Sequence, residues 1–199
     1  NYYKSLAANT YLKAEDTNNR AYLINGTPKV EASLTTTTAE DGWMIDGSTY
    51  ITLSNLKYTY ENNGKGRLSG AEEQAVQYTD VNNNSTSFTG SVTVGSDIFD
   101  NKYQTKVETT YISPDLVGGQ VKPLSAHTET YSISVDGSSS ITGSSLSYTY
   151  DQITINNKTG KVLVDVTPNQ ATVTLDDKSY TDTGIVTIGT DAFGNYYKS

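Results

Sequence analysis

The amino-acid sequence predicts an all-β protein made of two tandem β-sandwich domains of the same topology. Three observations support this fold class: a composition rich in strand and turn formers, short segments of alternating character, and an internal repeat of roughly 95 residues. The 199 residues are enough for two small domains. We place the first repeat at residues 1–105 and the second at residues 106–199.

The composition favours pleated strands joined by tight turns. Thr, Ser, Asn, Gly and Tyr dominate, and 16 Tyr stand against 3 Phe and 1 Trp. Thr and Tyr favour half-buried strand surfaces, whereas Ser, Asn and Gly favour turns. The hydrophobic share of 35% lies below the globular average, so each domain is expected to bury a thin core.

Charge and cysteine content exclude several classes of protein. The net charge is −8 and the 14 Lys and Arg residues do not cluster, so nucleic acid is not an expected partner. No apolar stretch reaches the length that a membrane span needs. Because the chain has no Cys, it has no disulfide, no thiolate metal site and no cysteine nucleophile.

The internal repeat rests on three blocks. Residues 45–60 match residues 135–150 at ten of sixteen positions, and residues 90–103 match residues 184–197 at eight of fourteen. The pentapeptide NYYKS stands at residues 1–5 and 195–199, with NKYQT between them at residues 101–105. We therefore expect corresponding residues to occupy matching places, namely Leu56/Leu146, Tyr58/Tyr148, Val92/Val186 and Phe99/Phe193.

Alternation and turn residues predict about seven short strands per repeat, as in a β-sandwich. The predicted strands include Ile51–Tyr60, with an irregularity near Asn55, and Val92–Gly95, Lys161–Thr167, Ala171–Leu175 and Ile185–Gly189. The predicted turns are Asp46-Gly47, Asn63-Gly64, Asp136-Gly137, Pro168-Asn169 and Asp176-Asp177. The single helix-like stretch is Gly70–Gln77.

The segment between the repeats does not have the composition of a flexible linker. Lys102–Ser113 contains neither Gly nor Pro, and its residues alternate between Tyr, Thr and Val positions and charged or amide positions. We predict one continuous strand that ends the first domain and begins the second.

The repeat length and the closing segment VTIGTDAFGNYY (residues 186–197) carry a family resemblance. The chain resembles the tandem immunoglobulin-like (Big-type) repeat domains of large bacterial cell-surface adhesins. The resemblance implies two immunoglobulin-like sandwiches at the extracellular cell surface, acting as a stalk or spacer in adhesion and biofilm formation. It implies no catalytic residue, neighbouring repeats of the same chain as partners, and a host or matrix glycan or protein as a further partner.

Side chains suited to catalysis are few. His127 is the single histidine and has no counterpart in the first repeat. The carboxylate pairs Glu40/Asp41 and Glu72/Glu73 also occur in one repeat only. We therefore expect no enzyme and no cofactor other than a candidate Ca²⁺.

That candidate Ca²⁺ site has two readings. Its oxygen ligands would be drawn from the loops near each repeat's end, namely Asp97, Asp100, Asn101, Asp191 and Asn195. The same residues also cap tight turns by accepting hydrogen bonds from nearby backbone N–H groups. Both readings are open at the level of sequence, although no complete calcium-loop motif is present.

Two rival functions remain open from the sequence. Trp43 and Tyr50 could stack on sugar rings in a glycan- or receptor-binding module, or Trp43 could pack in the core. Alternatively, the strand at residues 1–12 could add to a neighbour's open sheet edge and make the chain a self-assembling filament subunit. Candidate N-glycosylation sites for a secreted chain are Asn25, Asn83, Asn84 and Asn157.

Overall fold

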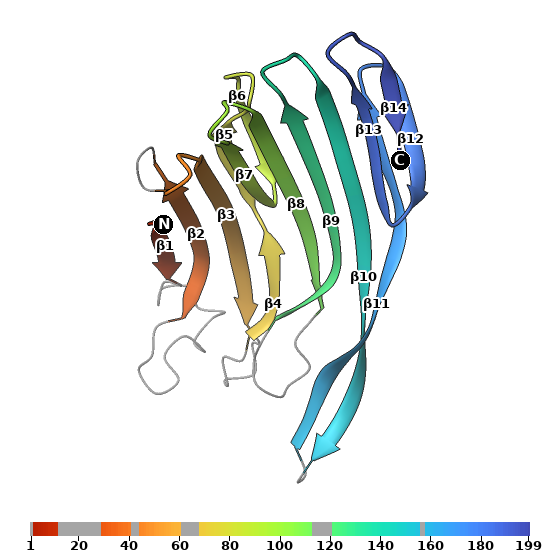
Figure 1. Ribbon diagram of the computed structural model, residues 1–199. Helices are drawn as coiled ribbons and strands as arrows, with labels where there is room; N and C mark the ends of the chain where they lie inside the picture. Colours follow the sequence, from red (N-terminus) through yellow and green to blue (C-terminus); the bar gives the residue numbers. More distant parts are fainter. Residues whose placement is uncertain (1, 12–28, 41–43, 61–67, 113–120, 156–157) are drawn as a thin grey trace.

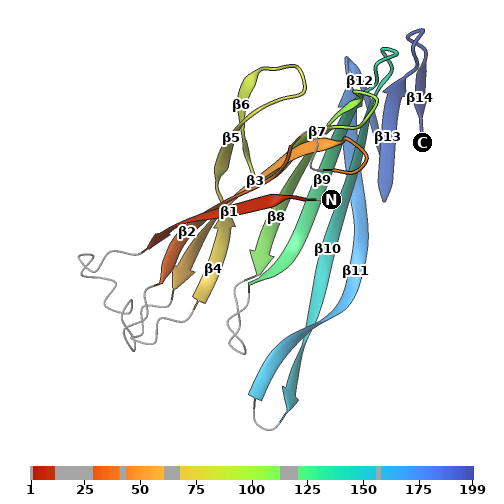
Figure 2. The same ribbon diagram turned by 60° about the vertical axis from the view of Figure 1, so that its left-hand side comes forward.

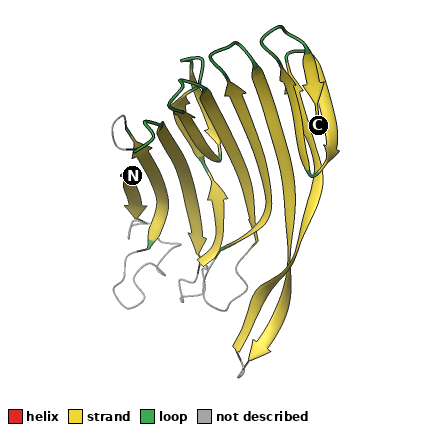
Figure 3. Cartoon of the chain, viewed as in Figure 1, coloured by secondary structure: helices red, strands yellow, loops and turns green. Residues whose placement is uncertain are grey.

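The computed structural model describes residues 2–11, 29–40, 44–60, 68–112, 121–155 and 158–199. These residues form an open 12-stranded sheet and a separate two-stranded hairpin, and none of them is helical (Figure 1, Figure 3). The all-β class predicted from the sequence is confirmed.

Fourteen strands make up this arrangement. In chain order they are β1 (Lys4–Tyr11), β2 (Val30–Ala39), β3 (Thr49–Tyr60), β4 (Leu68–Glu73), β5 (Ala75–Thr79), β6 (Ser85–Thr89), β7 (Ser91–Ser96), β8 (Lys102–Ile112), β9 (Lys122–Ile133), β10 (Ser139–Ile155), β11 (Lys158–Leu175), β12 (Lys178–Thr183), β13 (Ile185–Thr190) and β14 (Tyr196–Lys198).

One row of antiparallel neighbours crosses the whole sheet, in the order β1, β2, β3, β7, β8, β9, β10, β13 and β14. The edge of β3 that faces β7 is shared, because β7 pairs with residues 49–54 and β4 with residues 56–60. β10 is shared in the same way between β13 and β11.

The strand pairing repeats along this row. β1, β2, β3 and β7 correspond to β8, β9, β10 and β13, and β8 corresponds in turn to β14. The register shows this correspondence directly, because Ser5 faces Thr37 where Thr105 faces Thr130. The predicted pair Val92/Val186 also matches, because Val92 lies opposite Leu53 in β3 and Val186 lies opposite the corresponding Gly143 in β10.

Two immunoglobulin-like sandwiches are not confirmed. Each repeat adds strands to the same open sheet, and a hairpin, β5–β6 or the β11–β12 end, covers part of one face (Figure 2). The opposite face carries many Thr and Ser side chains, whose hydroxyls bond to one another across the strands. An antiparallel sheet can leave such a hydroxyl-rich face exposed to water, so a second full sheet is not required to cover it.

Two small apolar cores hold the hairpins against the sheet. The first contains Val76, Tyr78 and Val92, with Leu53, Phe88 and Val94 packed against it. The second contains Ala171, Val173, Leu175, Val186 and Ile188, with Tyr131, Ile141 and Tyr180 at its side. The separation of these cores agrees with the two repeats found in the sequence.

Two sequence predictions about secondary structure are wrong. Gly70–Gln77 is not helical, because its residues form the end of β4 and the start of β5 and pair with β3 and β6. Pro168-Asn169 is not a turn but lies inside β11, where that strand leaves β10 and begins to pair with β12. A proline is tolerated at such a change of partner because few ladder hydrogen bonds are lost there.

The irregularity expected near Asn55 is a change of partner as well. β7 pairs with β3 as far as Ser54 and β4 pairs with it from Leu56, while the Asn55 carbonyl accepts a hydrogen bond from Gln74 N at 2.8 Å. The register shift itself lies further along, between Thr59 and Tyr60.

The predicted glycine turns are confirmed where the structure describes them. Gly47 and Gly137 adopt φ values of 75° and 88°, and each donates a backbone hydrogen bond three residues back. Asp176-Asp177 forms the turn between β11 and β12, with φ 52° at Asp176. Asn63-Gly64 lies outside the described residues.

Candidate functional site

Strand β8 is shared by the two repeats. Its residues 102–107 pair with β7 on one edge, and residues 102–112 pair with β9 on the other. The predicted continuous strand is confirmed for Lys102–Ile112, whereas Ser113 lies outside the described residues. The boundary that we drew between residues 105 and 106 therefore falls inside a strand that is hydrogen-bonded on both sides.

Glu73 supports β8 beyond the point where β7 ends. The last pair between these strands is Ser91 with Val107, and two residues further on Thr109 N donates to Glu73 Oε2 at 2.7 Å. Burial raises the pKa of the Glu73 carboxyl, and the hydrogen bonds from Thr109 oppose that rise. In the second repeat the matching position, opposite Leu146, is held by Pro168.

A row of hydroxyl residues crosses the whole sheet at right angles to the strands. Neighbouring members face each other in register, in the order Ser5, Thr37, Thr52, Thr93, Thr105, Thr130, Thr142 and Thr187. We call this set the threonine row. Several neighbouring hydroxyls share hydrogen bonds of 2.8–3.0 Å, including Thr52–Thr93 and Thr105–Thr130. The row continues through β8 and so links the two repeats.

Tyrosine rings lie over glycines next to this row. A Cβ atom added to Gly95 would lie 2.6 Å from Cζ of Tyr103, which faces Gly95 across the β7–β8 pair. The same contact recurs between Gly189 and Tyr197 in the β13–β14 pair. Glycine is required at both positions because the ring occupies the space of a side chain.

The aspartates proposed as calcium ligands are engaged by their own loops. Asp97 Oδ1 accepts hydrogen bonds from the backbone N–H groups of Phe99 and Asn101 at 2.8 and 3.0 Å, and its Oδ2 accepts one from Asn101 Nδ2 at 2.8 Å. Asp191 makes the same three bonds at 2.9 Å each, to Phe193 and Asn195. The side-chain bonds from the two asparagines hold the pKa of both aspartates below its ordinary value.

A third loop of this kind was missed from the sequence. Asp80 Oδ1 accepts from Asn82 N and Asn84 N, and Asp80 Oδ2 accepts from Asn84 Nδ2. The shared signal is Asp followed four residues later by Asn. In each loop the residue before that Asn has positive φ: 65° at Asn83, 63° at Asp100 and 80° at Gly194. Asp100 thus supplies the left-handed backbone position. Among the described residues, no three His, Cys, Asp or Glu side chains are grouped so that they could hold a metal ion.

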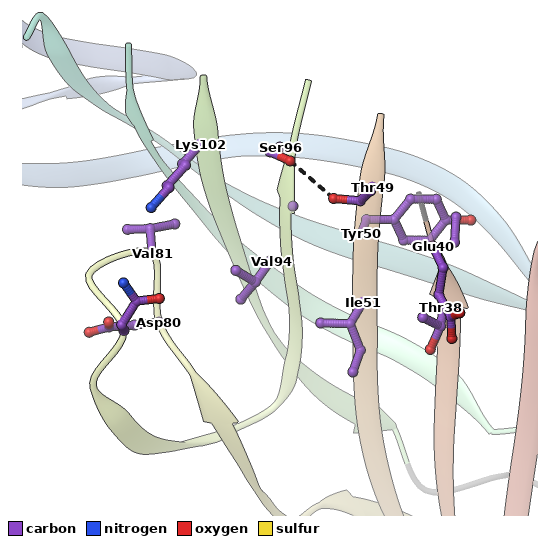
Figure 4. Close-up of a pocket in the computed structure, with 13 residues that line it drawn as sticks. Thr38, Glu40, Thr49, Tyr50, Ile51, Asp80, Val81, Val94, Ser96 and Lys102 are labelled. Carbon is purple, nitrogen blue, oxygen red and sulfur yellow. Dashed lines mark hydrogen bonds between the residues drawn. The ribbon is translucent and has the colours of Figure 1, made fainter. Parts of the chain in front are cut away.

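Tyr50 and the pocket beside it come from the first repeat. The pocket has a volume of about 440 Å³ and lies between the turn after β5 and the strands β2, β3 and β7. Figure 4 shows Asp80, Val81 and Lys102 on one side of it, while the ring of Tyr50 points away from Val94. Strand alternation therefore turns Tyr50 toward the face of Tyr103 and the threonine row. Trp43 lies outside the described residues.

The remaining candidate residues are scattered. His127 lies in β9 between Ser145 and Glu108 and is partly buried. Asn83 and Asn84 are exposed in the turn before β6, although Asn84 Nδ2 donates to Asp80; Asn25 and Asn157 lie outside the described residues. Within the described part of the chain, no helix is long and apolar enough to cross a membrane.

Comparison of this chain with protein-family models, with curated proteins and with solved structures finds no match.

Proposed function

We propose that this chain is a structural spacer, of the kind that immunoglobulin-like repeats provide in bacterial surface adhesins, and that it carries no catalytic activity. The observation that supports the proposal most strongly is strand β8, which is hydrogen-bonded into both repeats. A spacer must keep its repeats in a constant relative orientation, and a shared strand does so without a separate interface.

The physical argument is that bending at β8 breaks ladder hydrogen bonds on one side or the other. A buried backbone group left without a partner costs about 1–3 kcal/mol, and β8 carries several such groups on each edge. Each repeat adds four strands to the row, so at a spacing of about 4.8 Å it lengthens the sheet by roughly 20 Å. Each repeat therefore adds little length for its number of residues, which suits a broad, stiff ribbon.

An extracellular, cell-surface location is part of the same proposal. It is supported by the acidic composition rich in Thr, Ser and Asn, and by hydroxyl side chains that satisfy one another across the open face. Neighbouring repeats of the same chain are the partners that the shared strand suggests, and the binding partner of the parent assembly is a host or matrix glycan or protein.

Small-angle scattering tests the spacer role. We expect the two repeats to give one narrow range of shapes, and a Gly-Gly insertion after Lys106 to broaden it. The matched control inserts Gly-Gly after Asn82, in the hairpin turn away from β8. Equal distributions for all three proteins, broad in each case, would show a flexible tether and contradict the proposal.

A second candidate function is supported by the tyrosines on the open face. Tyr50 and Tyr103 face Gly95 from either side, and the Tyr103 ring lies over that glycine, next to the hydroxyls of the threonine row. Aromatic rings beside hydroxyl groups are suited to stacking on sugar rings. Glycan-array binding that is lost in Tyr50→Ala and Tyr103→Ala, and kept in the exposed control Phe193→Ala, would support this function.

A further inference from the structure

We propose that copies of this chain join head to tail, with β1 of one copy replacing β14 of another and pairing with its β13. The occupant of this edge is thus a second copy of the chain. The inference concerns how copies of this 199-residue chain connect.

The first argument is that β1 and β14 begin from the same sequence. NYYKS leads into β1 at residues 1–5 and forms β14 at residues 195–199. β8 occupies the corresponding place inside the sheet, between β7 and β9. β1 already has the partner that corresponds to β9, namely β2, and no described strand pairs with its outer edge.

The second argument is that the structure contains the template for the joint. β7 pairs with β8 over six residues, with Thr93 facing Thr105 and Gly95 facing Tyr103. Transferring this register to β13 and an incoming β1 places Ser5 opposite Thr187 and Tyr3 opposite Gly189. The threonine row then continues from one copy into the next without a break.

The third argument is that the contacts of β14 can be made equally by the incoming strand. Tyr196 donates a hydrogen bond to Asp176 Oδ2 at 2.7 Å, and Lys198 Nζ lies 4.9 Å from the ring centroid of Tyr180. Tyr197 lies over Gly189. The corresponding residues are Tyr2 and Tyr3, which precede β1, and Lys4, its first residue. The two tyrosines are 77% and 68% exposed in the single copy.

An incoming β1 would also pair with a part of β13 that β14 and Ser199 do not pair with. β14 and Ser199 pair with residues 187–190 of β13, and Ile185 is left 75% exposed. The pentapeptides exchange like for like. In addition, Leu6 and Ala7 of the incoming strand come to lie opposite Val186 and Ile185, as Lys106 and Val107 lie opposite Val92 and Ser91.

The joint is directional, so it does not close on itself in a pair. The β1 edge of each copy meets the β13 edge of the next, and such heterologous contacts give open chains of subunits. Each new copy extends the same sheet in the same register.

Engineered cysteines provide the main test, since the chain has none of its own. Ser5→Cys and Thr187→Cys lie in β1 and β13, at positions that face each other across the proposed joint, within the Cα separation that a disulfide spans. Oxidising the double variant should give a ladder of covalent oligomers, and mixing the two single variants should give one mixed dimer. The control Leu6→Cys with Thr187→Cys puts the thiols on opposite faces of the strand pair and should give few crosslinks.

A second set of variants separates exchange from nonspecific association, with association measured by sedimentation. Ser199 exchanges both backbone hydrogen bonds with Thr187. Ser5 corresponds to Ser199, and Ala7 lies two residues further along β1 with the same backbone orientation. The backbone N–H of Ala7 therefore points to the outer edge of β1. Ala7→Pro should therefore abolish association while the β1–β2 pairing is kept. Tyr2→Ala should weaken association roughly tenfold, the effect of one hydrogen bond to a charged group, whereas Tyr196→Ala should strengthen it by weakening β14.

Three results would overturn the inference. They are a monomer at all concentrations with no disulfide ladder, a disulfide between two Ser5→Cys chains that outcompetes the mixed dimer, and equal effects of Tyr2→Ala and Tyr196→Ala. The second of these would instead show pairing of two β1 edges.

Discussion

The two hairpins that cover the sheet differ in how closely they lie on it. In the first repeat β5 lies against β3 and β7 while β6 projects outward, whereas in the second both β11 and β12 lie against β13 (Figure 2). One position accounts for much of this difference. A Cβ atom on Gly143 would lie 2.5 Å from Cγ1 of Val173, so the hairpin can approach only because this residue is glycine. Leu53 stands at the corresponding place in the first repeat and packs against its core.

The tips of the hairpins differ as well. In the second repeat Tyr196 bonds to Asp176, and Lys178 Nζ lies 3.3 Å from the centroid of the Tyr196 ring. In the first repeat Lys102 takes the place of Tyr196 and lines the pocket beside Asp80 and Val81. Two positions thus distinguish the hairpin that lies close to the sheet from the one that leaves a pocket. They are Leu53 or Gly143 under the hairpin, and Lys102 or Tyr196 beside its tip.

The largest expected effect comes from making the second repeat resemble the first. Gly143→Leu forces the β11–β12 hairpin off the sheet and should lower the free energy of unfolding by about 3 kcal/mol, the upper range for overpacking. Thermal or urea unfolding measures this loss. The control Ser145→Leu adds the same side chain two residues along β10, at the position that faces Asn169. Equal losses in the two variants would contradict the role assigned to Gly143.

The second prediction concerns the hydrogen bond from Thr109 N to the Glu73 carboxylate, which supports the shared strand β8. The second repeat has Pro168 at the matching position. Glu73→Ala leaves the half-buried Thr109 N–H without its acceptor and should cost about 2 kcal/mol of stability. Glu73→Gln keeps an acceptor oxygen and should lose less. Urea unfolding of both variants gives the difference, and hydrogen exchange at Thr109 should rise in the alanine variant alone.

A smaller effect is expected from making the first repeat resemble the second. Lys102→Tyr supplies a ring and a hydroxyl beside Asp80, as Tyr196 does beside Asp176, and should stabilise the first repeat by about 1 kcal/mol. Exchange protection of β5 and β6 should increase. Lys102→Phe is the control without the hydroxyl, and protection equal to that of the tyrosine variant would assign the gain to packing alone.

The smallest individual effects should come from acid, and they should fall on both repeats alike. Asp97 and Asp191 have pKa values held below the ordinary 3.8 by hydrogen bonds from Asn101 and Asn195. Their stabilisation is therefore complete above about pH 4 and is lost as the pH falls through the lowered values. Melting temperatures measured between pH 6 and 2 should fall in this window. Asp97→Asn and Asp191→Asn should each flatten part of the fall.

Glu73 titrates with the opposite sign. Because burial raises its pKa above the ordinary 4.5, protonation favours the folded chain, and stability falls as the pH rises through the raised value. In Glu73→Gln this contribution should be missing, and the acid limb that the aspartates cause should remain.

Several features of the fold could be predicted because they depend on neighbouring residues only. The alternation of Lys102–Ile112 and its lack of Gly and Pro identified the shared strand, and the matched blocks paired Val92 with Val186. The loop around Asp97 and Asn101 was read as either a turn or a calcium site, and the hydrogen bonds made by Asp97 are those of the turn reading.

The candidate site was predictable in part. Tyr50 was singled out, but the Tyr103 ring over Gly95 was missed because that contact crosses two strands. The bond from Thr109 N to Glu73 joins residues 36 positions apart, and the sequence around either residue gives no sign of it.

The sequence by itself determined the repeat, the all-β class and the continuity of strand β8, because period-two alternation and turn chemistry are local properties of the chain. Only the tertiary structure decided that the repeats extend one open sheet instead of closing into two sandwiches. A strand presents the same alternation whether its edge pairs with a strand of its own repeat or of the next. The choice rests on long-range pairing along both edges of β8.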